Sequence, residues 1–251
     1  MDPVTQTLGD DGVLLIALNR PDQRNAIDDA MTDALRAAFE RAASDAAVRA
    51  VILTGEGKAF SAGGDLSRFE RDWDPREFRH DSHRLTSLIT LLERLEKPTV
   101  AAINGAVTGA GTQLALVCDV RLAAASARFI YREGRLGIIP SHGGVTRLVK
   151  LIGQARARDI LLGGEELSAQ EAQSAGLVTA VHADDELLGA ARSRVAVMLE
   201  RSPQAYAAAK RLLWLAGNVD LESGMVAEGL AQSLLIGTAE HKQAVREVRR
   251  R

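Results

Sequence analysis

The sequence predicts an α/β protein with a helical C-terminal region. First, short apolar runs that stop at glycine or proline alternate with longer stretches whose apolar residues recur at helical spacing. Second, two of these runs lead into glycine-rich loops followed by helical patterns. Third, the pattern from Asp184 onward is almost entirely helical. We therefore expect an α/β region over residues 1–182 and a helical region over residues 183–251.

The predicted strands are short apolar runs without regular polar alternation, which is typical of strands buried on both faces. In chain order they are DGVLLIALN (11–19), RAVILTG (49–55), TVAAING (99–105), a pair of strands within VRLAAASARFIY (120–131), and LVTAVH (177–182).

The predicted helices lie between and after these strands, and two glycine-rich loops separate strand from helix. The helices are AMTDALRAAFERAAS (30–44), a long one within residues 76–98 that stops before Pro98, TQLALVCD (112–119), and three near GGVTRLVKLIG, ARARDILLG and SAQEAQSAG. The loops are GEGKAFSAGGDL (55–66) and AVTGAG (106–111). The helices of the C-terminal region carry enough apolar residues to need a partner surface, either the core or another subunit.

The bulk composition is that of a globular protein that folds without disulfide or metal staples. Hydrophobic residues make up 46% and charged residues 25% of the 251 positions. A net charge of -2 gives no support to nucleic-acid binding, and no apolar run approaches the ~20 residues that span a bilayer. The single cysteine, Cys118, lies in an apolar run and is expected to be a buried, inert thiol, so we predict a cytoplasmic protein.

Several familiar motifs are absent or incomplete. His80 and His83 have a spacing that can chelate a metal, but no further ligand motif accompanies them, so we predict no metal site. The loop GAVTGAG satisfies neither the dinucleotide pattern nor the P-loop pattern, and no G-x-S-x-G elbow is present.

Two similar strand–glycine loop–helix corners are more informative. They are RAVILTG/KAFSAGG/DLSRF and TVAAING/AVTGAG/TQLALV. Each can present free backbone N–H groups near a helix N-terminus, and two such groups aimed at one point would stabilise an oxyanion. Such corners are also common in α/β folds without any catalytic role. Glu133, in YREGRLGIIPSHGG, is either a solvated surface charge or an acid/base whose pKa is raised in a dry pocket.

Taken together, three segments resemble the signatures of the enoyl-CoA hydratase/isomerase (crotonase) superfamily in order and spacing. They are KAFSAGGDL (58–66), INGAVTGAGTQLALVCD (103–119) and EGRLGIIPSHGGVTRL (133–148). LNRPDQRNAID (18–28), EELSAQEAQSAGLVTAV (165–181) and TAEHKQAVREV (238–248) extend the resemblance over nearly the whole chain. It implies a ββα spiral core and a C-terminal helical region used for trimerisation, often in a hexamer made of two trimers.

The resemblance also implies an acyl-CoA thioester substrate, with coenzyme A as part of that substrate and no separate cofactor. The backbone N–H groups of Gly64 and Ala110 would hold the thioester oxygen, although the family usually has glycine at the second position. The residues that would bind coenzyme A are Arg24, Ala26, Ala62, Asp65 and Leu66. A guanidinium such as that of Arg24 suits phosphate.

A typical hydratase of this family uses two glutamates, and this chain matches only one of them. Glu133 lies seven residues before Pro140, as in the family, but Gln113 stands at the other position. An amide can hydrogen-bond water but cannot take its proton, whereas one carboxylate can move a proton from C2 to C4 of an acyl chain. We therefore favour a Δ3-Δ2-enoyl-CoA isomerase with Glu133 as the single acid/base.

Three alternatives remain open at this point. A 2-enoyl-CoA hydratase could use Glu133 with Gln113, or with His142, which stands where the family often has a small residue. His142 could equally be a loop histidine that caps the next helix. Acids within residues 67–82 could line the acyl pocket. Finally, a protein of this fold could bind acyl-CoA, or a partner protein, without turnover.

Overall fold

The computed structural model describes residues 2–164 and 166–250, and the chain divides into two compact units. The first unit runs to Ala196 and the second starts at Val197. Helix α7 (Leu187–Leu199) lies mostly in the first unit because its Leu187, Ala191 and Val195 are buried. The compact α/β unit therefore extends past residue 182, the end expected from the sequence.

A six-stranded sheet forms the centre of the first unit. Its order is β1-β2-β3-β5-β7-β10, with β1 antiparallel to β2 and every other pair parallel. The strands are β1 (Val4–Leu8), β2 (Val13–Leu18), β3 (Ala50–Gly55), β5 (Thr99–Ile103), β7 (Val120–Ala124) and β10 (Ala180–His182). Strands β3, β5 and β7 are buried along their whole length, as expected for parallel strands covered on both faces.

A second sheet of four short strands follows the order β4-β6-β8-β9. These strands are β4 (Ala59–Ser61), β6 (Ala106–Thr108), β8 (Arg128–Ile130) and β9 (Glu166–Ser168). Consecutive strands alternate between the sheets: β3, β5 and β7 join the larger sheet, and β4, β6 and β8 join the smaller one. Each turn of the chain thus adds one strand to the larger sheet and one to the smaller sheet, and a helix then leads to the next turn. This arrangement is a ββα spiral.

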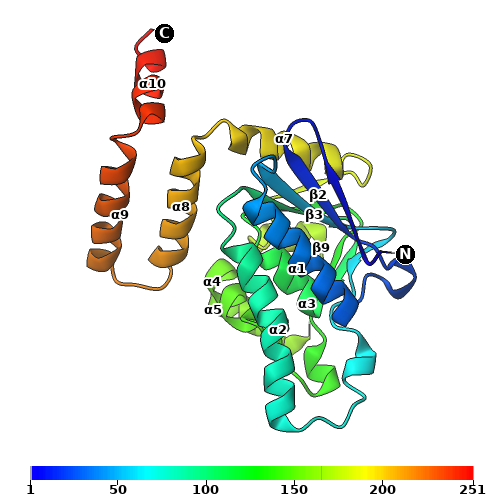
Figure 1. The fold of residues 1–251 in the computed structure, drawn as a ribbon. Helices are drawn as coiled ribbons and strands as arrows, with labels where there is room; N and C mark the ends of the chain where they lie inside the picture. Colours follow the sequence, from blue (N-terminus) through cyan, green and yellow to red (C-terminus); the bar gives the residue numbers. More distant parts are fainter. Residues whose placement is uncertain (1, 165, 251) are drawn as a thin grey trace. The chain divides into compact units, whose positions relative to one another are not determined.

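The helices cover the sheets and set the positions of the loops between them. They are α1 (Asp29–Ser44), α2 (Pro75–Glu93), α3 (Gly109–Leu116), α4 (Gly144–Ile152), α5 (Gln154–Gly163) and α6 (Ala169–Ser174), with short 3-10 turns at Pro21–Gln23, Leu66–Arg68 and Glu133–Leu136. Helix α1 packs against β1 and β2 and runs beside α2 (Figure 1). Its N-cap is Asp28, which accepts a hydrogen bond of 2.8 Å from the Met31 N–H.

The long helices and most strands agree with the predicted elements, including the short strands β8 and β10, but four strands do not. Strands β4 and β6 lie inside the segments 55–66 and 106–111, which were predicted as loops. Strands β1 and β9 also have no counterpart among the predicted elements. A strand of three residues is too short for any periodicity, so its partners in the sheet decide its conformation.

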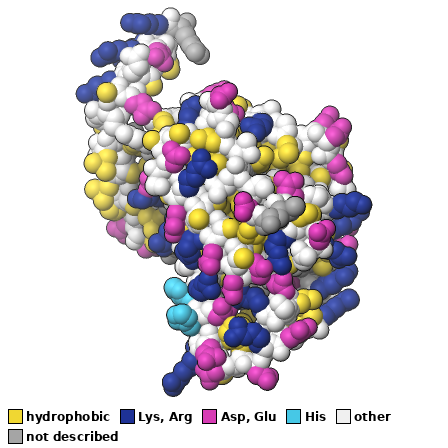
Figure 2. All heavy atoms as spheres, turned by 45° about the vertical axis from the view of Figure 1, so that its right-hand side comes forward, with side chains coloured by type: hydrophobic (Ala, Val, Ile, Leu, Met, Phe, Trp, Pro, Cys, Tyr) yellow, Lys and Arg dark blue, Asp and Glu magenta, His cyan; other side chains and the backbone are white. Residues whose placement is uncertain are grey.

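The second unit consists of helices with apolar residues left on their surfaces. These are α8 (Pro203–Ala216), α9 (Leu221–Leu235) and α10 (Ala239–Val248), and no residue of these three helices is buried. Large exposed side chains include Leu213, Trp214, Leu221, Leu230 and Leu234. Apolar side chains gather on these helices in Figure 2, whereas basic and acidic side chains are interspersed over the rest of the face shown.

Candidate active site

A cavity of about 950 Å³ opens in the first unit, beside the smaller sheet. It is lined by the corner after β4, the start of α3, the turn around Glu133, the loop before α4 and one side of α2. Nine of the ten residues singled out from the sequence line it: Ala26, Ala62, Gly64, Asp65, Leu66, Ala110, Gln113, Glu133 and His142. Arg24 is exposed and does not line the cavity.

The two glycine corners meet at the floor of the cavity. A Cβ atom added to Gly63 would stand 2.9 Å from the Thr108 carbonyl oxygen and 3.3 Å from the Ala110 nitrogen, so the two loops are in direct contact. The φ angle of Gly63 is 79°, a left-handed conformation that favours glycine. Only a glycine at this position lets the two corners approach so closely.

The N–H groups of Gly64 and Ala110 are the exposed donors of this floor. Ala110 is the second residue of α3, whose first N–H groups have no carbonyl partner within the helix. Gly64 forms a bridge with Ile27, but the bonds of that bridge use the nitrogens of Ile27 and Asp65. Within the described residues neither N–H donates a hydrogen bond, so both remain available to an oxygen atom in the cavity.

Glu133 is a buried acid in this cavity, with only 9% of its surface exposed. Burial raises the pKa of its carboxyl group, and backbone N–H groups of Glu133 and Arg132 lower it in part. Its neighbour Arg132 pairs with Glu166 at 2.7 Å instead. Across the described ranges no cation pairs with Glu133, which excludes the interpretation of an ordinary surface ion pair.

Gln113 faces the same cavity and is 3% exposed. Its amide lies against Gly144, because a Cβ atom added to that glycine would stand 2.7 Å from the Gln113 Nε2. Its Oε1 is buried without a hydrogen-bond partner in the described part of the chain. A buried acceptor without a partner is costly, so this oxygen is ready for a donor that enters the cavity.

Comparison with known proteins agrees with this geometry. A family model for enoyl-CoA hydratase/isomerase matches residues 9–247. The chain is 37% identical over 233 residues to the 2,3-dehydroadipyl-CoA hydratase of Escherichia coli (strain K12), a match that covers 93% of this chain and 90% of that protein. The crystal structure of an enoyl-CoA hydratase from Bacillus anthracis superimposes with a TM-score of 0.93 at 34% identity, covering 99% of this chain and 96% of that one.

A second solved structure gives the same result. An enoyl-CoA hydratase from Geobacillus kaustophilus HTA426 superimposes with a TM-score of 0.92 at 32% identity, covering 97% of this chain and 93% of that chain. This chain belongs to the enoyl-CoA hydratase/isomerase family. It is therefore an enzyme of this type with the crotonase fold, as the resemblance of its motifs predicts.

In this family member, the segment predicted to bind coenzyme A runs beside the first glycine corner. The Ala62 N–H donates to the Arg24 carbonyl at 2.8 Å, and the Ile27 N–H donates to the Gly63 carbonyl at 2.7 Å. Asp65 accepts hydrogen bonds from Ser67 and Arg20, which hold its pKa below the usual value. Asp65 is therefore an anion that stabilises the loop after β4. The roles of the predicted residues in binding coenzyme A stay predictions.

Asn25 is a residue of this segment that sequence reasoning missed. It is fully buried, and its φ angle is 57°. Its side-chain amide donates to the carbonyls of Glu56 at 2.9 Å and Ala59 at 2.8 Å, and its Oδ1 accepts from the Arg20 N–H at 2.9 Å. These bonds fasten the segment to the end of β3 and the start of β4. An Asn in a loop before a helix carries no sequence signal for so many distant partners.

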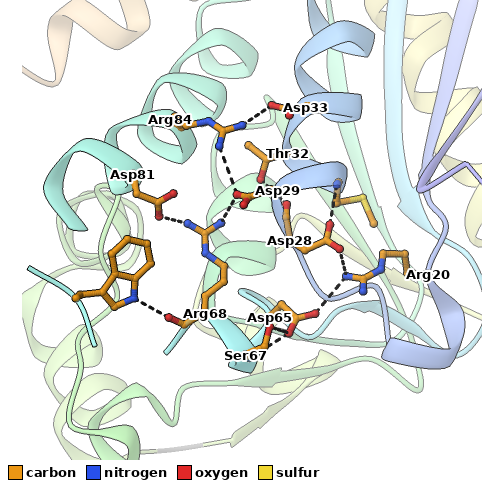
Figure 3. Close-up of polar contacts among 12 residues, drawn as sticks. Arg20, Asp28, Asp29, Thr32, Asp33, Asp65, Ser67, Arg68, Asp81 and Arg84 are labelled. Carbon is orange, nitrogen blue, oxygen red and sulfur yellow. Dashed lines mark hydrogen bonds and ion pairs between the residues drawn. The ribbon is translucent and has the colours of Figure 1, made fainter. Parts of the chain in front are cut away.

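Only some of the acids within residues 67–82, which could line the acyl pocket, lie at the cavity. Glu70, Asp72 and Asp74 do not line the cavity, and Asp74 is the N-cap of α2. Asp81 does line it and pairs with Arg68, which also contacts Asp29 of α1 (Figure 3). This wall of the cavity is thus a network of ion pairs between α1, α2 and the turn at Leu66–Arg68.

The described residues contain neither a metal-binding cluster nor a membrane-spanning helix. No group of three or more His, Cys, Asp or Glu side chains there could hold a metal ion, and His80 and His83 are both exposed. Among the helices of residues 2–164 and 166–250, none is long and apolar enough to cross a membrane.

Proposed function

We propose that this enzyme converts Δ3-enoyl-CoA into Δ2-enoyl-CoA, with Glu133 as its only acid/base. The observation that carries this proposal is the pairing of a buried glutamate with a buried amide in one cavity. Of the three carboxylates that line the cavity, Asp65 and Asp81 have arginine partners, and Glu133 has none among the described residues. Gln113 occupies the position where a second acid would be needed for two-carboxylate hydration.

The reaction then needs one proton carrier and one oxyanion site. The Glu133 carboxylate removes a proton from C2, and the electron pair moves onto the thioester oxygen to give a dienolate. The N–H groups of Gly64 and Ala110 stabilise this oxyanion, and each such donor contributes about 3 kcal/mol. The protonated Glu133 returns the proton to C4, and the double bond closes between C2 and C3. Atoms and charge balance without a second carboxylate.

Burial of Glu133 supports this role because it raises the pKa of the carboxyl group. A raised pKa brings the carboxyl group closer to neutral pH, where it can both take and return a proton. The surrounding low dielectric also strengthens the hydrogen bonds to the oxyanion.

A 2-enoyl-CoA hydratase is the second candidate, and one observation favours it. The unpartnered Oε1 of Gln113 could accept a hydrogen bond from a water molecule while Glu133 removes its other proton. The relatives reported above are also named as hydratases. Binding of acyl-CoA without turnover is the outcome expected if neither reaction is found.

The test is a rate comparison with 2-enoyl-CoA and 3-enoyl-CoA of the same chain length. We expect the wild-type enzyme to isomerise the 3-enoyl thioester at least tenfold faster than it hydrates the 2-enoyl thioester. Gln113→Glu should gain hydration by about 100-fold, because it supplies the second carboxylate. Gln23→Glu, which adds the same charge at another part of the cavity lining, should gain none. Fast hydration by the wild type without isomerisation would contradict the proposal.

Assembly, cofactor and location belong to the same proposal. The exposed apolar residues of α8, α9 and α10 suit a homotrimer, or a hexamer of two trimers, in which neighbouring subunits cover them. Coenzyme A enters as part of the substrate, and no further cofactor is required by the proton transfers above. The single, buried thiol of Cys118 is compatible with a cytoplasmic enzyme.

A further inference from the structure

His142 is held in place by contacts of both its backbone and its ring. Its φ angle is 55°, an unusual left-handed conformation for a residue other than glycine. Its carbonyl oxygen accepts a hydrogen bond of 2.6 Å from Arg147, whose guanidinium is fixed by two bonds of 2.7 and 2.6 Å to Glu93. Strained backbone of this kind persists only where the surroundings enforce it, and it is concentrated at functional sites.

The ring of His142 is fixed as well, by a contact with Thr86. Its Nδ1 lies 2.9 Å from the Thr86 hydroxyl, and that hydroxyl donates its own proton to the Ser82 carbonyl at 3.0 Å. When the hydroxyl gives its single proton to the Ser82 carbonyl, it can only accept from Nδ1–H of the histidine, and the proposal below takes this tautomer. The Nε2 of a neutral ring then carries the lone pair.

The surroundings keep this ring neutral. Burial lowers the pKa of His142 to about 4, and the nearby Arg68 and Arg147 also lower it while Asp81 raises it. At neutral pH the Nε2 is therefore an acceptor. The structure shows no partner for it among the residues described, although His142 lines the cavity.

Arg68 and Trp73 of this wall are already engaged, while Ser82 and Ser141 also line it. Arg68 uses its guanidinium on Asp29 and Asp81, and the Trp73 indole N–H donates to the Arg68 carbonyl at 2.6 Å (Figure 3). The remaining lining of this part is largely apolar and includes Phe69, Trp73, Phe78, Leu85, Ile138 and Ile139. We call this part of the cavity, formed by residues 67–86 and 138–142, the acyl end.

We propose that His142 selects acyl groups that carry a hydroxyl, whose proton it accepts at Nε2. This inference rests on the proposed function for one step, the direction of the substrate. With the thioester oxygen at Gly64 and Ala110 and coenzyme A along residues 23–27 and 62–66, the acyl group extends toward α2 and His142. A carboxylate at the same place would meet the Nε2 lone pair, and the nearby Arg68 is already paired with Asp81. The site therefore suits a neutral donor.

The test uses saturated ligands, so that it does not depend on which reaction is catalysed. Dissociation constants are measured by calorimetry for matched trios of acyl-CoA that end in methyl, hydroxyl or carboxylate, at chain lengths of four, five and six carbons. We expect the hydroxyl form to bind about tenfold more tightly than the methyl form at one length, equivalent to about 1.4 kcal/mol. Equal binding at every length, or tightest binding of the carboxylate, would overturn the proposal. Failure of all ligands to bind would instead reject the proposed function.

Four variants locate the preference in the histidine. His142→Gly relieves the left-handed backbone and removes the ring, so the preference should fall to about one while methyl ligands bind as before. His142→Asn, which also tolerates this backbone and keeps an acceptor, should retain part of it. Thr86→Val should reduce the preference about threefold by freeing the ring. Thr90→Val is the matched control, because Thr90 makes the same bond to a helix carbonyl one turn away and should change nothing.

The tautomer can be measured directly. Nitrogen NMR of the ring, with the His142→Asn spectrum for the resonance assignment, distinguishes an Nδ1–H ring from an Nε2–H ring. We expect the Nδ1–H form in the free enzyme and a shift of the Nε2 resonance when the hydroxyl ligand binds. An Nε2–H ring in the free enzyme would refute the proposed acceptor, whatever the ligand affinities.

Discussion

The two parts of the cavity are built in different ways. The residues that would carry the chemistry are Gly64 and Ala110 at the meeting point of the two glycine corners, Gln113 in α3, and Glu133, the buried residue of the turn Glu133–Leu136; we call this the reaction end. The acyl end includes apolar side chains that are partly exposed, with Phe69 and Phe78 at 45% and 40%. We therefore expect the two corners to set the reaction and the segment near the surface to set the choice of substrate.

The largest expected effect is at the reaction end. Glu133→Gln should lower kcat about 1000-fold, because it removes the only base that the proposal uses. Protein stability should change little, since the amide has nearly the same shape. Glu166→Gln, a change at the exposed glutamate that pairs with Arg132, should stay within about twofold of wild type. Retention of activity in Glu133→Gln would show that Glu133 is structural.

The pH dependence of kcat/KM is a second test of Glu133 as the base. The base must be deprotonated, so kcat/KM should fall as the pH drops through the pKa of Glu133. Burial raises this pKa, so the acid limb should lie above the range of an ordinary glutamate. The limb should disappear in Glu133→Gln, because its residual rate no longer depends on that carboxylate. An acid limb at the ordinary glutamate value would contradict a buried base.

The next effect tests the contact between the two corners. Gly63→Ala places a methyl group against Thr108, Gly109 and Ala110 at 2.9 to 3.3 Å and strains a φ angle of 79°. We expect a loss of about 2–4 kcal/mol in the free energy of unfolding and a fall of about 100-fold in kcat.

The control for this substitution is Gly57→Ala. Gly57 has a similar φ angle of 75°, but its added methyl group would meet only the side chain and Cα of Pro21, outside the cavity. It should lose about 1 kcal/mol of stability and keep its kcat. If both variants lose kcat equally, backbone strain rather than corner geometry explains the loss.

The smallest effect is expected at the acyl end. Phe78 packs edge-to-face on Trp73, with ring centroids 5.7 Å apart. Phe78→Ala removes this contact, worth about 1 kcal/mol, so KM should rise about fivefold with kcat unchanged. Leu162→Ala, at an exposed apolar residue outside the cavity lining, should leave both constants as they are. A large loss of kcat in Phe78→Ala would mean that the two ends are not independent.

The sequence predicts some parts of the fold and of the site, and leaves others undetermined. Strand β3 and helix α1 are long enough for their own residues to predict them, and the order of the glycine corners and Glu133 identifies the family. The three-residue strands β4 and β6 could not be found, because their pairing comes from distant segments. Nine of the ten predicted site residues line one cavity, but their roles and the preference for isomerisation stay predictions.

Contacts between residues far apart in the sequence are the second feature that the sequence alone does not predict. Thr86 and His142 are 56 positions apart, and nothing in either local sequence indicates that one fixes the ring of the other. Asn25 likewise reaches Ala59 across 34 positions. Such pairs are set by the packing of complete elements, so only the folded chain reveals them.

The spiral has a consequence for how such an enzyme can diversify. The segment 66–84 leaves the core directly after Asp65, and α2 rejoins it at Leu85, the first buried residue of that helix. Both ends of the segment are anchored, and doubling the length of a flexible loop costs only about 0.6 kcal/mol. We therefore expect changes of length between Asp65 and Asp74, before α2 begins, to leave the two sheets in place.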